Sequence, residues 1–114
     1  MHEASIAASL IEIVKETAAN HQAKKVTKVF VQIGRLAGIE IDSLQFAYDA
    51  IKEDHNIIKD SEIIIEDVRI TGKCQKCGVI DTYDEMFFKC SKCGSYEVEL
   101  LTGEELKITE IEVD

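Results

Sequence analysis

The chain has 114 residues, enough for one modest domain or for a small domain that carries a smaller insert. Its net charge is −9, from 22 acidic and 13 basic side chains, so its electrostatic field repels phosphate backbones and anionic membrane surfaces. We therefore expect no nucleic acid and no membrane among its partners, and no apolar run approaches the roughly 18 residues of a membrane span.

The first predicted elements are a helix and a strand. From Ala4 to about Asn20, apolar residues recur at three- and four-residue steps, which is typical of one stripe of an amphipathic helix: Ile6, Leu10, Ile13, Val14 and Ala18. From Val26 to Ile33, Val29, Val31 and Ile33 share one face, which is the period of a strand. A loop from Gly34 to Ile41 follows.

A second helix is predicted after this loop. Asp42 with Gln45 three positions later has the pattern of an acidic cap, and apolar residues at helical spacing continue to about Glu53. Two further strands are predicted, from Glu62 to Ile70 and from Leu106 to Val113.

Between these last two strands lie all four cysteines, in two pairs with identical spacing: Cys74, Cys77, Cys90 and Cys93. Zinc(II) takes four thiolates tetrahedrally, and two residues between cysteines let one turn present both sulfurs to the same ion. Four sulfurs leave no position for water, so we expect a structural Zn(II) site rather than a catalytic one. Each cysteine follows a lysine, which favours the thiolate, and Gly78 and Gly94 follow the second cysteine of each pair.

The order of elements predicts an α+β fold, in which a small three-stranded sheet is packed by two helices and carries an inserted zinc ribbon. The expected main domain comprises residues 1–71 and 96–114, and the inserted zinc-binding domain comprises residues 72–95. Two other interpretations of the cysteines stay open. One is a zinc-ribbon binding module for nucleic acid or protein, and the other is a thiol oxidoreductase that cycles between dithiol and disulfide.

A second candidate metal site lies at the start of the chain, Met1-His2-Glu3, which we take as the start of the protein, without a leader. The terminal amine, the His2 amide and the His2 imidazole together can wrap a square-planar ion, a geometry that nickel(II) and copper(II) favour. Glu3 and Glu40 are the candidates for a further donor. The absence of a leader and the metal-type cysteine spacing favour the cytoplasm.

Met1-His2-Glu3, the helix that follows at once, and the four cysteines together resemble the HypA/HybF family of hydrogenase nickel incorporation proteins. The resemblance covers the whole chain. It implies a nickel-binding domain with an inserted zinc ribbon, acting as a metallochaperone, not an enzyme, that hands Ni(II) to the large subunit of [NiFe] hydrogenase. It also implies a GTPase partner, HypB, and in some organisms urease maturation factors.

The resemblance also implies roles for individual residues. His2 matches the family's nickel ligand, Met1 and Glu3 match its neighbours, and the four cysteines match the zinc ligands. Glu40 stands in the loop where some members place an acidic nickel donor. Position 35 departs from the pattern, because many members have an acid there and this chain has Arg35.

Overall fold

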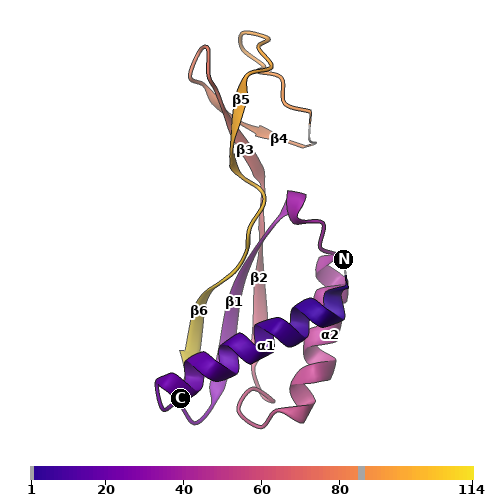
Figure 1. The fold of residues 1–114 in the computed structure, drawn as a ribbon, viewed down its shortest axis with the longest axis vertical. Helices are drawn as coiled ribbons and strands as arrows, with labels where there is room; N and C mark the ends of the chain where they lie inside the picture. Colours follow the sequence, from indigo (N-terminus) through magenta and orange to yellow (C-terminus); the bar gives the residue numbers. More distant parts are fainter. Residues whose placement is uncertain (1, 85–86) are drawn as a thin grey trace. The chain divides into compact units, whose positions relative to one another are not determined.

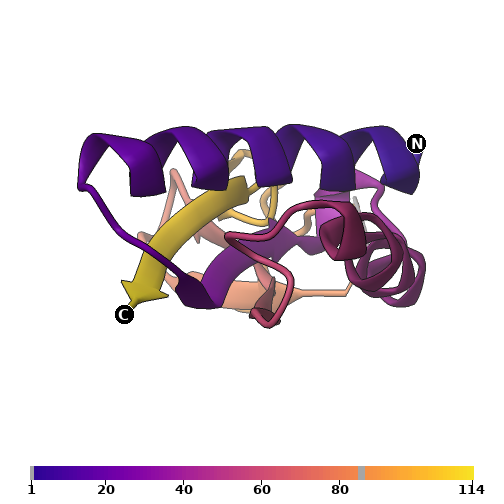
Figure 2. The same ribbon diagram turned by 90° about the horizontal axis from the view of Figure 1, so that it is seen from below.

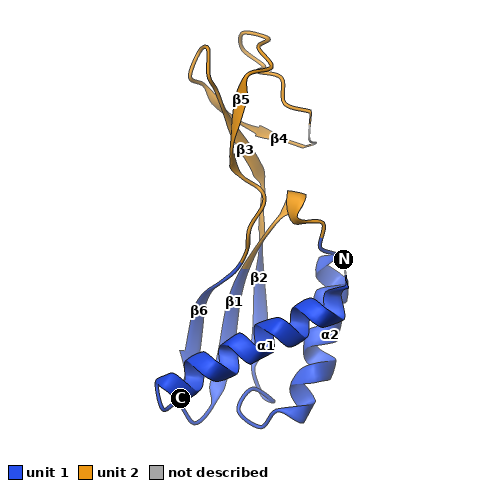
Figure 3. Ribbon diagram, viewed as in Figure 1, with its two compact units in different colours: residues 1–31, 39–66, 107–114 blue, residues 32–38, 67–106 orange. Residues whose placement is uncertain are grey.

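The structure, a computed structural model, describes residues 2–84 and 87–114 and divides into two compact units (Figure 3). Unit 1 is residues 1–31, 39–66 and 107–114, and unit 2 is residues 32–38 and 67–106. The helices and strands are α1 (Glu3–Asn20), β1 (Val26–Gly34), the 3-10 helix η1 (Arg35–Ala37), α2 (Ile41–Ile51), the 3-10 helix η2 (Lys52–Asp54), β2 (Glu62–Val68), β3 (Ile70–Cys74), β4 (Ile80–Tyr83), β5 (Val98–Thr102) and β6 (Leu106–Val113).

One three-stranded sheet has the order β2-β1-β6, with β1 in the centre. In unit 1, α1 runs across one face of these strands, and α2 packs against α1 (Figures 1 and 2). The central strand buries Val29, Val31 and Ile33 almost completely. The predicted fold, a three-stranded sheet packed by two helices, is confirmed.

The buried stripe of α1 consists of Ala7, Leu10, Ile11, Val14 and Ala18. Its spacing is that of a helix with one face in the core, which explains why the periodicity in the sequence predicted this element correctly. Ile13, which the sequence placed on the stripe, is instead half exposed, at 52%. Across the described residues, no helix combines the length and the apolar character that crossing a lipid bilayer requires.

The start of α2 differs from the prediction. The helix begins at Ile41, so its N-cap is Glu40 and Asp42 lies inside the first turn. The Glu40 side chain makes no capping hydrogen bond. The carboxylate of Glu3 accepts the N–H of Glu40 instead, at 3.2 Å, and Asp42 contributes a negative charge at the positive end of the helix.

The second sheet belongs to unit 2 and has the order β4-β3-β5, with both neighbours antiparallel to β3. The single strand predicted from Glu62 to Ile70 is wrong: it divides at Arg69 into β2 and the start of β3, which lie in different sheets. The sequence did not predict β4 or β5. Both strands are short, and β5 alternates only between half-buried and exposed positions, so neither has the strong contrast of buried apolar and exposed polar residues that marks a strand in a sequence.

Unit 2 is larger than the expected insert of residues 72–95, because it extends over 67–106 and includes residues 32–38. Backbone hydrogen bonds hold residues 32–38 to the link between β5 and β6: the Gly34 N–H donates to the Glu105 carbonyl at 2.8 Å, and the Leu36 N–H donates to the Gly103 carbonyl at 2.7 Å. A Cβ at position 34 would collide with the Gly103 carbonyl group and lie 2.6 Å from the Glu104 nitrogen. Only glycine permits the two backbones to approach this closely.

Candidate metal centres

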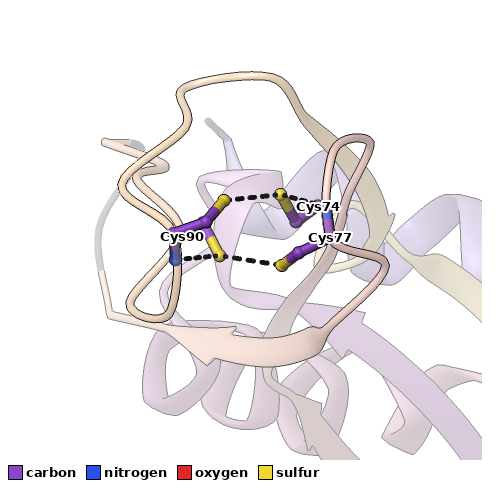
Figure 4. A group of neighbouring side chains, drawn as sticks. Cys74, Cys77 and Cys90 are labelled. Carbon is purple, nitrogen blue, oxygen red and sulfur yellow. Dashed lines mark hydrogen bonds between the residues drawn. The ribbon is translucent and has the colours of Figure 1, made fainter.

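The four cysteines of unit 2 come together at the ends of two similar loops (Figure 4). Their sulfur atoms all lie within 4.8 Å of one another. Cys74 is the last residue of β3, whereas Cys90 lies in a segment outside any helix or strand. These first cysteines of each pair are both buried. Cys77 and Cys93 are exposed. The sequence prediction that one cluster uses all four cysteines is therefore matched by the geometry.

The two loops repeat the same set of hydrogen bonds. The Cys77 N–H and the Cys93 N–H each donate to the first sulfur of their own pair, at 3.4 Å. The glycine that follows each pair has φ of +77° and donates its N–H to the carbonyl of the first cysteine, at 2.9 Å for Gly78 and 3.0 Å for Gly94. The glycines thus tighten the turns, whereas the N–H groups directed at sulfur come from the cysteines themselves.

The distances between sulfurs fit a metal better than a disulfide. The sulfurs of Cys74 and Cys93 are 3.5 Å apart, as are those of Cys77 and Cys90. A disulfide needs about 2.05 Å. Four sulfurs placed tetrahedrally about 2.3 Å from a zinc ion are about 3.8 Å apart. Both short contacts join one loop to the other, so the arrangement is one four-sulfur site rather than two separate dithiols.

Backbone N–H groups also favour thiolates at the buried sulfurs. The N–H of Cys77, aided by that of Lys76, lowers the pKa of Cys74 to about 6 in spite of desolvation. The N–H of Cys93 likewise lowers the pKa of Cys90. The lysines were expected to act through their ammonium groups, but Lys76 and Lys92 act here through the main chain.

Cys93 behaves differently from the buried pair. The Ser95 N–H favours its thiolate, but the thiol of Cys74, desolvation and the thiols of Cys90 and Cys77 outweigh this effect and raise the pKa of Cys93 to about 11. Four thiolates at this spacing repel one another, so full ionisation requires a cation at the centre. The donor set, its spacing and its electrostatics all fit zinc.

The sequence did not predict one polar contact of unit 2. Asp81 of β4 accepts a hydrogen bond from the Ser91 hydroxyl at 2.7 Å and another from the Thr82 N–H at 2.8 Å. The Ser91 hydroxyl, followed by the Thr82 N–H, lowers the pKa of Asp81. This contact ties the second loop to the sheet, and no local pattern connects the two positions.

The predicted amino-terminal site lies in unit 1. Met1 is outside the described residues; His2 is exposed and is the N-cap of α1, and its carbonyl accepts the N–H groups of Ser5 and Ile6. The Glu3 carboxylate accepts the Glu40 N–H, which lowers the pKa of Glu3. Glu3 and Glu40, the two candidates for a further nickel donor, are 37 positions apart in the sequence but adjacent in the structure. Glu40 itself is exposed.

His2 and Glu3 also border a groove of about 480 Å³ between the start of α1 and α2, lined further by Ala4, Ser43, Phe46, Ala47, Ala50 and Ile51. The two other histidines are engaged elsewhere. Nδ1 of His21 donates to the Thr17 carbonyl at 2.9 Å, and Nδ1 of His55 accepts from Lys15 at 3.1 Å. Arg35 pairs with Asp67 at 3.5 Å.

The chain matches a known family along nearly its whole length. Residues 1–113 match the family described as "Hydrogenase/urease nickel incorporation, metallochaperone, hypA". The Hydrogenase maturation factor HypA of Campylobacter jejuni is 41% identical over 108 residues, covering 95% of each chain. That of Psychromonas ingrahamii is 40% identical over 114 residues, covering 100% of this chain and 99% of the relative.

A similar solved structure is the "Solution structure of the Ni metallochaperone HypA from Helicobacter pylori". It superposes with a TM-score of 0.70 at 28% identity and covers 99% of this chain and 97% of that one. The sequence match, the shared fold and the cysteine cluster agree: the chain belongs to the HypA family of hydrogenase/urease nickel incorporation metallochaperones, and its four cysteines fit a structural zinc site.

Proposed function

We propose that this protein carries Ni(II) at its amino terminus and delivers it for the maturation of [NiFe] hydrogenase. The Met1 amine, the His2 amide nitrogen and the His2 imidazole supply three donors in fused five- and six-membered chelate rings. A planar arrangement of nitrogen donors suits nickel(II) and does not suit zinc. The cysteine cluster is the separate, structural Zn(II) site.

The position of His2 is the observation that carries this proposal. An N-cap residue contributes its carbonyl to the helix, but its own N–H lies outside the helical hydrogen-bond ladder. The His2 amide nitrogen is therefore free of the helix and available to a metal. The imidazole is exposed, so an ion can enter and leave without unfolding the protein, as a carrier requires.

We assign the fourth donor to Glu3 or Glu40. The hydrogen bond from the Glu40 N–H to the Glu3 carboxylate holds the two acids beside each other at the start of α1. If Glu3 is only an anchor, Glu3→Gln keeps an oxygen that can accept this N–H and retains nickel affinity, whereas Glu40→Gln lowers it. The opposite pattern assigns the donor to Glu3.

A nickel titration of protein with a free Met1 amine tests the proposal, followed by the absorption of planar Ni(II). His2→Ala, or acetylation of the α-amine, is expected to lower the affinity by more than tenfold, since outer-shell groups alone alter metal affinity by about 10–100-fold. His21→Ala is the matched control, because His21 is exposed and its ring donates to the Thr17 carbonyl of its own helix. Binding by His2→Ala at wild-type strength would contradict the proposal.

Delivery requires partners. We propose the HypB GTPase and the large subunit of [NiFe] hydrogenase, together with urease maturation factors where urease is present, all in the cytoplasm. The sequence contains no Gly-x-x-x-x-Gly-Lys phosphate loop, so a GTPase partner would supply the nucleotide energy. The match to a metallochaperone family supports a carrier rather than an enzyme. Radioactive nickel is expected to pass to the purified large-subunit precursor from wild-type protein and not from His2→Ala.

A further inference from the structure

Phe46 of α2 is the most exposed large apolar side chain in the part of the chain that the structure describes, at 77%. It lines the groove of about 480 Å³ where the start of α1 lies beside α2 (Figure 1). Isolated apolar side chains on a surface are common, whereas apolar residues that line one groove, with polar residues at its rim, are typical of a protein-binding site.

The shape of the groove suits a helix from another protein. Its α2 side follows one stripe over two turns, formed by Ser43, Phe46, Ala47, Ala50 and Ile51. Most of these side chains are small, so the backbone of a third helix can approach closely. Phe46 supplies the large aromatic contact that such helix-in-groove complexes use as an anchor.

The chain on both sides of the groove is acidic. Residues 1–14 and 36–51 contain no lysine or arginine and have five acids, Glu3, Glu12, Glu40, Asp42 and Asp49. Such a surface attracts a basic partner and orients it as it approaches. It repels a second copy of this chain, whose net charge is −9, and anionic membranes as well. The charge therefore favours a basic protein segment as the occupant.

The groove is also continuous with the proposed nickel site, because His2 and Glu3 line it. A protein that takes an ion from His2 must bring its own ligands within bonding distance of that ion. Its surface therefore comes to lie over this end of the groove, and contacts along the groove would hold it in the orientation that transfer needs.

We propose that this groove is the docking site of the nickel-accepting protein, and that a helix with an apolar face flanked by lysine or arginine fills it. The inference rests on the proposed function, because that function places the ion at His2. The acceptor is the large-subunit precursor proposed above. Phe46 anchors its helix, and the surrounding acids pair with the basic flanks.

Binding of the purified large-subunit precursor to the full, zinc-loaded chain, measured by calorimetry without nickel, tests the inference. Phe46→Ser is expected to weaken binding about tenfold or more, because truncation of an aromatic anchor removes a large part of the binding energy. Ile13→Ser is the matched control and should bind within twofold of wild type. Ile13 is also exposed, at 52%, and lies on the other helix of unit 1, but it lines a different groove.

A second variant tests the charge and leaves Phe46 in place. The Asp49 side chain is 52% exposed, and its partner Lys52 keeps a hydrogen bond to the Ser61 carbonyl when Asp49 is replaced. Asp49→Lys is expected to weaken binding at low ionic strength and to reduce its dependence on salt. Glu104→Lys makes the same change in net charge in unit 2 and should have a smaller effect on both.

Three results would overturn the inference: no binding of the precursor by wild type, binding by Phe46→Ser within twofold of wild type, or equal effects of Asp49→Lys and Glu104→Lys. Nickel affinity, measured in the same samples, should be unchanged in Phe46→Ser. The proposed function fails on a different result, which is undiminished nickel binding by His2→Ala, so the two failures are distinguishable.

Discussion

The cysteine side chains differ in how readily they lose a proton, although the two loops repeat each other in sequence. Backbone N–H groups lower the pKa of Cys74 to about 6 and also lower the pKa of Cys90, whereas the neighbouring thiols help to raise that of Cys93 to about 11. The metal-free site is therefore partly ionised before zinc arrives.

Proton release should report this difference. At pH 7.5 the Cys74 thiol is already largely ionised, so zinc binding to the metal-free protein is expected to release fewer than four protons. Below pH 6, Cys74 becomes protonated and the number should approach four. Calorimetry in buffers of different ionisation enthalpy measures the number; four protons released at both pH values would contradict the assignment.

A single glycine decides how closely two segments of unit 2 approach. Gly34→Ala is expected to reduce the stability by about 3 kcal/mol or more, because the new methyl group meets the backbone of Gly103 and Glu104 rather than a flexible side chain. Urea unfolding followed by circular dichroism measures this change.

Gly38→Ala is the control for that substitution. Gly38 has φ of +72° and open space around its missing side chain, so the expected cost is only the left-handed penalty of about 1–2 kcal/mol. Equal losses for the two variants would show that close backbone approach is not the cause at Gly34.

At the scale of elements, a buried polar network fixes α2 to the chain that precedes β2. The Ser61 hydroxyl donates to the Ile58 carbonyl at 2.6 Å, so the Tyr48 hydroxyl is the donor in its contact with Ser61. Lys52 adds a hydrogen bond to the Ser61 carbonyl at 2.8 Å. Both hydroxyls are buried away from water, so each depends on the other for a hydrogen bond.

Tyr48→Phe is expected to reduce the free energy of unfolding by about 1–2 kcal/mol, because it removes one buried hydrogen bond and leaves the Ser61 oxygen short of a donor. Thermal unfolding of the zinc-loaded protein measures this loss. The exposed Tyr96→Phe is the matched control and should leave the midpoint unchanged. A Tyr48→Phe protein as stable as the control would show that the network contributes nothing.

At the scale of the whole molecule, the two units differ in what stabilises them. Unit 1 has two helices packed together and a buried sheet centre, whereas β5 of unit 2 is intermediate or exposed at every position. We therefore expect zinc to supply much of the stability of unit 2, because metal binding at such a site is coupled to folding.

Removal of zinc by a chelator should therefore affect the units unequally. Amide exchange protection is expected to be lost in β3, β4 and β5 and to persist in α1 and the part of β1 that lies in unit 1. Hydrogen exchange with and without chelator measures this difference, and restored zinc should restore protection. Equal loss in both units would contradict independent stabilisation.

Several elements followed from local sequence patterns. The apolar stripe of α1 and the alternation in β1 are short-range signals, and both elements lie where the periodicity predicted them. The division of one predicted strand at Arg69 was not predictable in this way, because neighbouring partners decide which sheet a strand joins. The side-chain cap at Asp42 was wrong for a related reason, since the N–H of Glu40 finds its acceptor 37 residues away.

The sequence by itself determined the α+β class and the four-cysteine cluster that fits a structural zinc site, because helical periodicity and cysteine spacing are local signals. Only the tertiary structure decided that Glu3 meets Glu40, that Gly34 lies against Gly103, and that the hydroxyl of Tyr83 is buried without a hydrogen-bond partner among the described residues. Each of these depends on which distant segments pack together, and that follows from burial of the whole core rather than from any one stretch of chain.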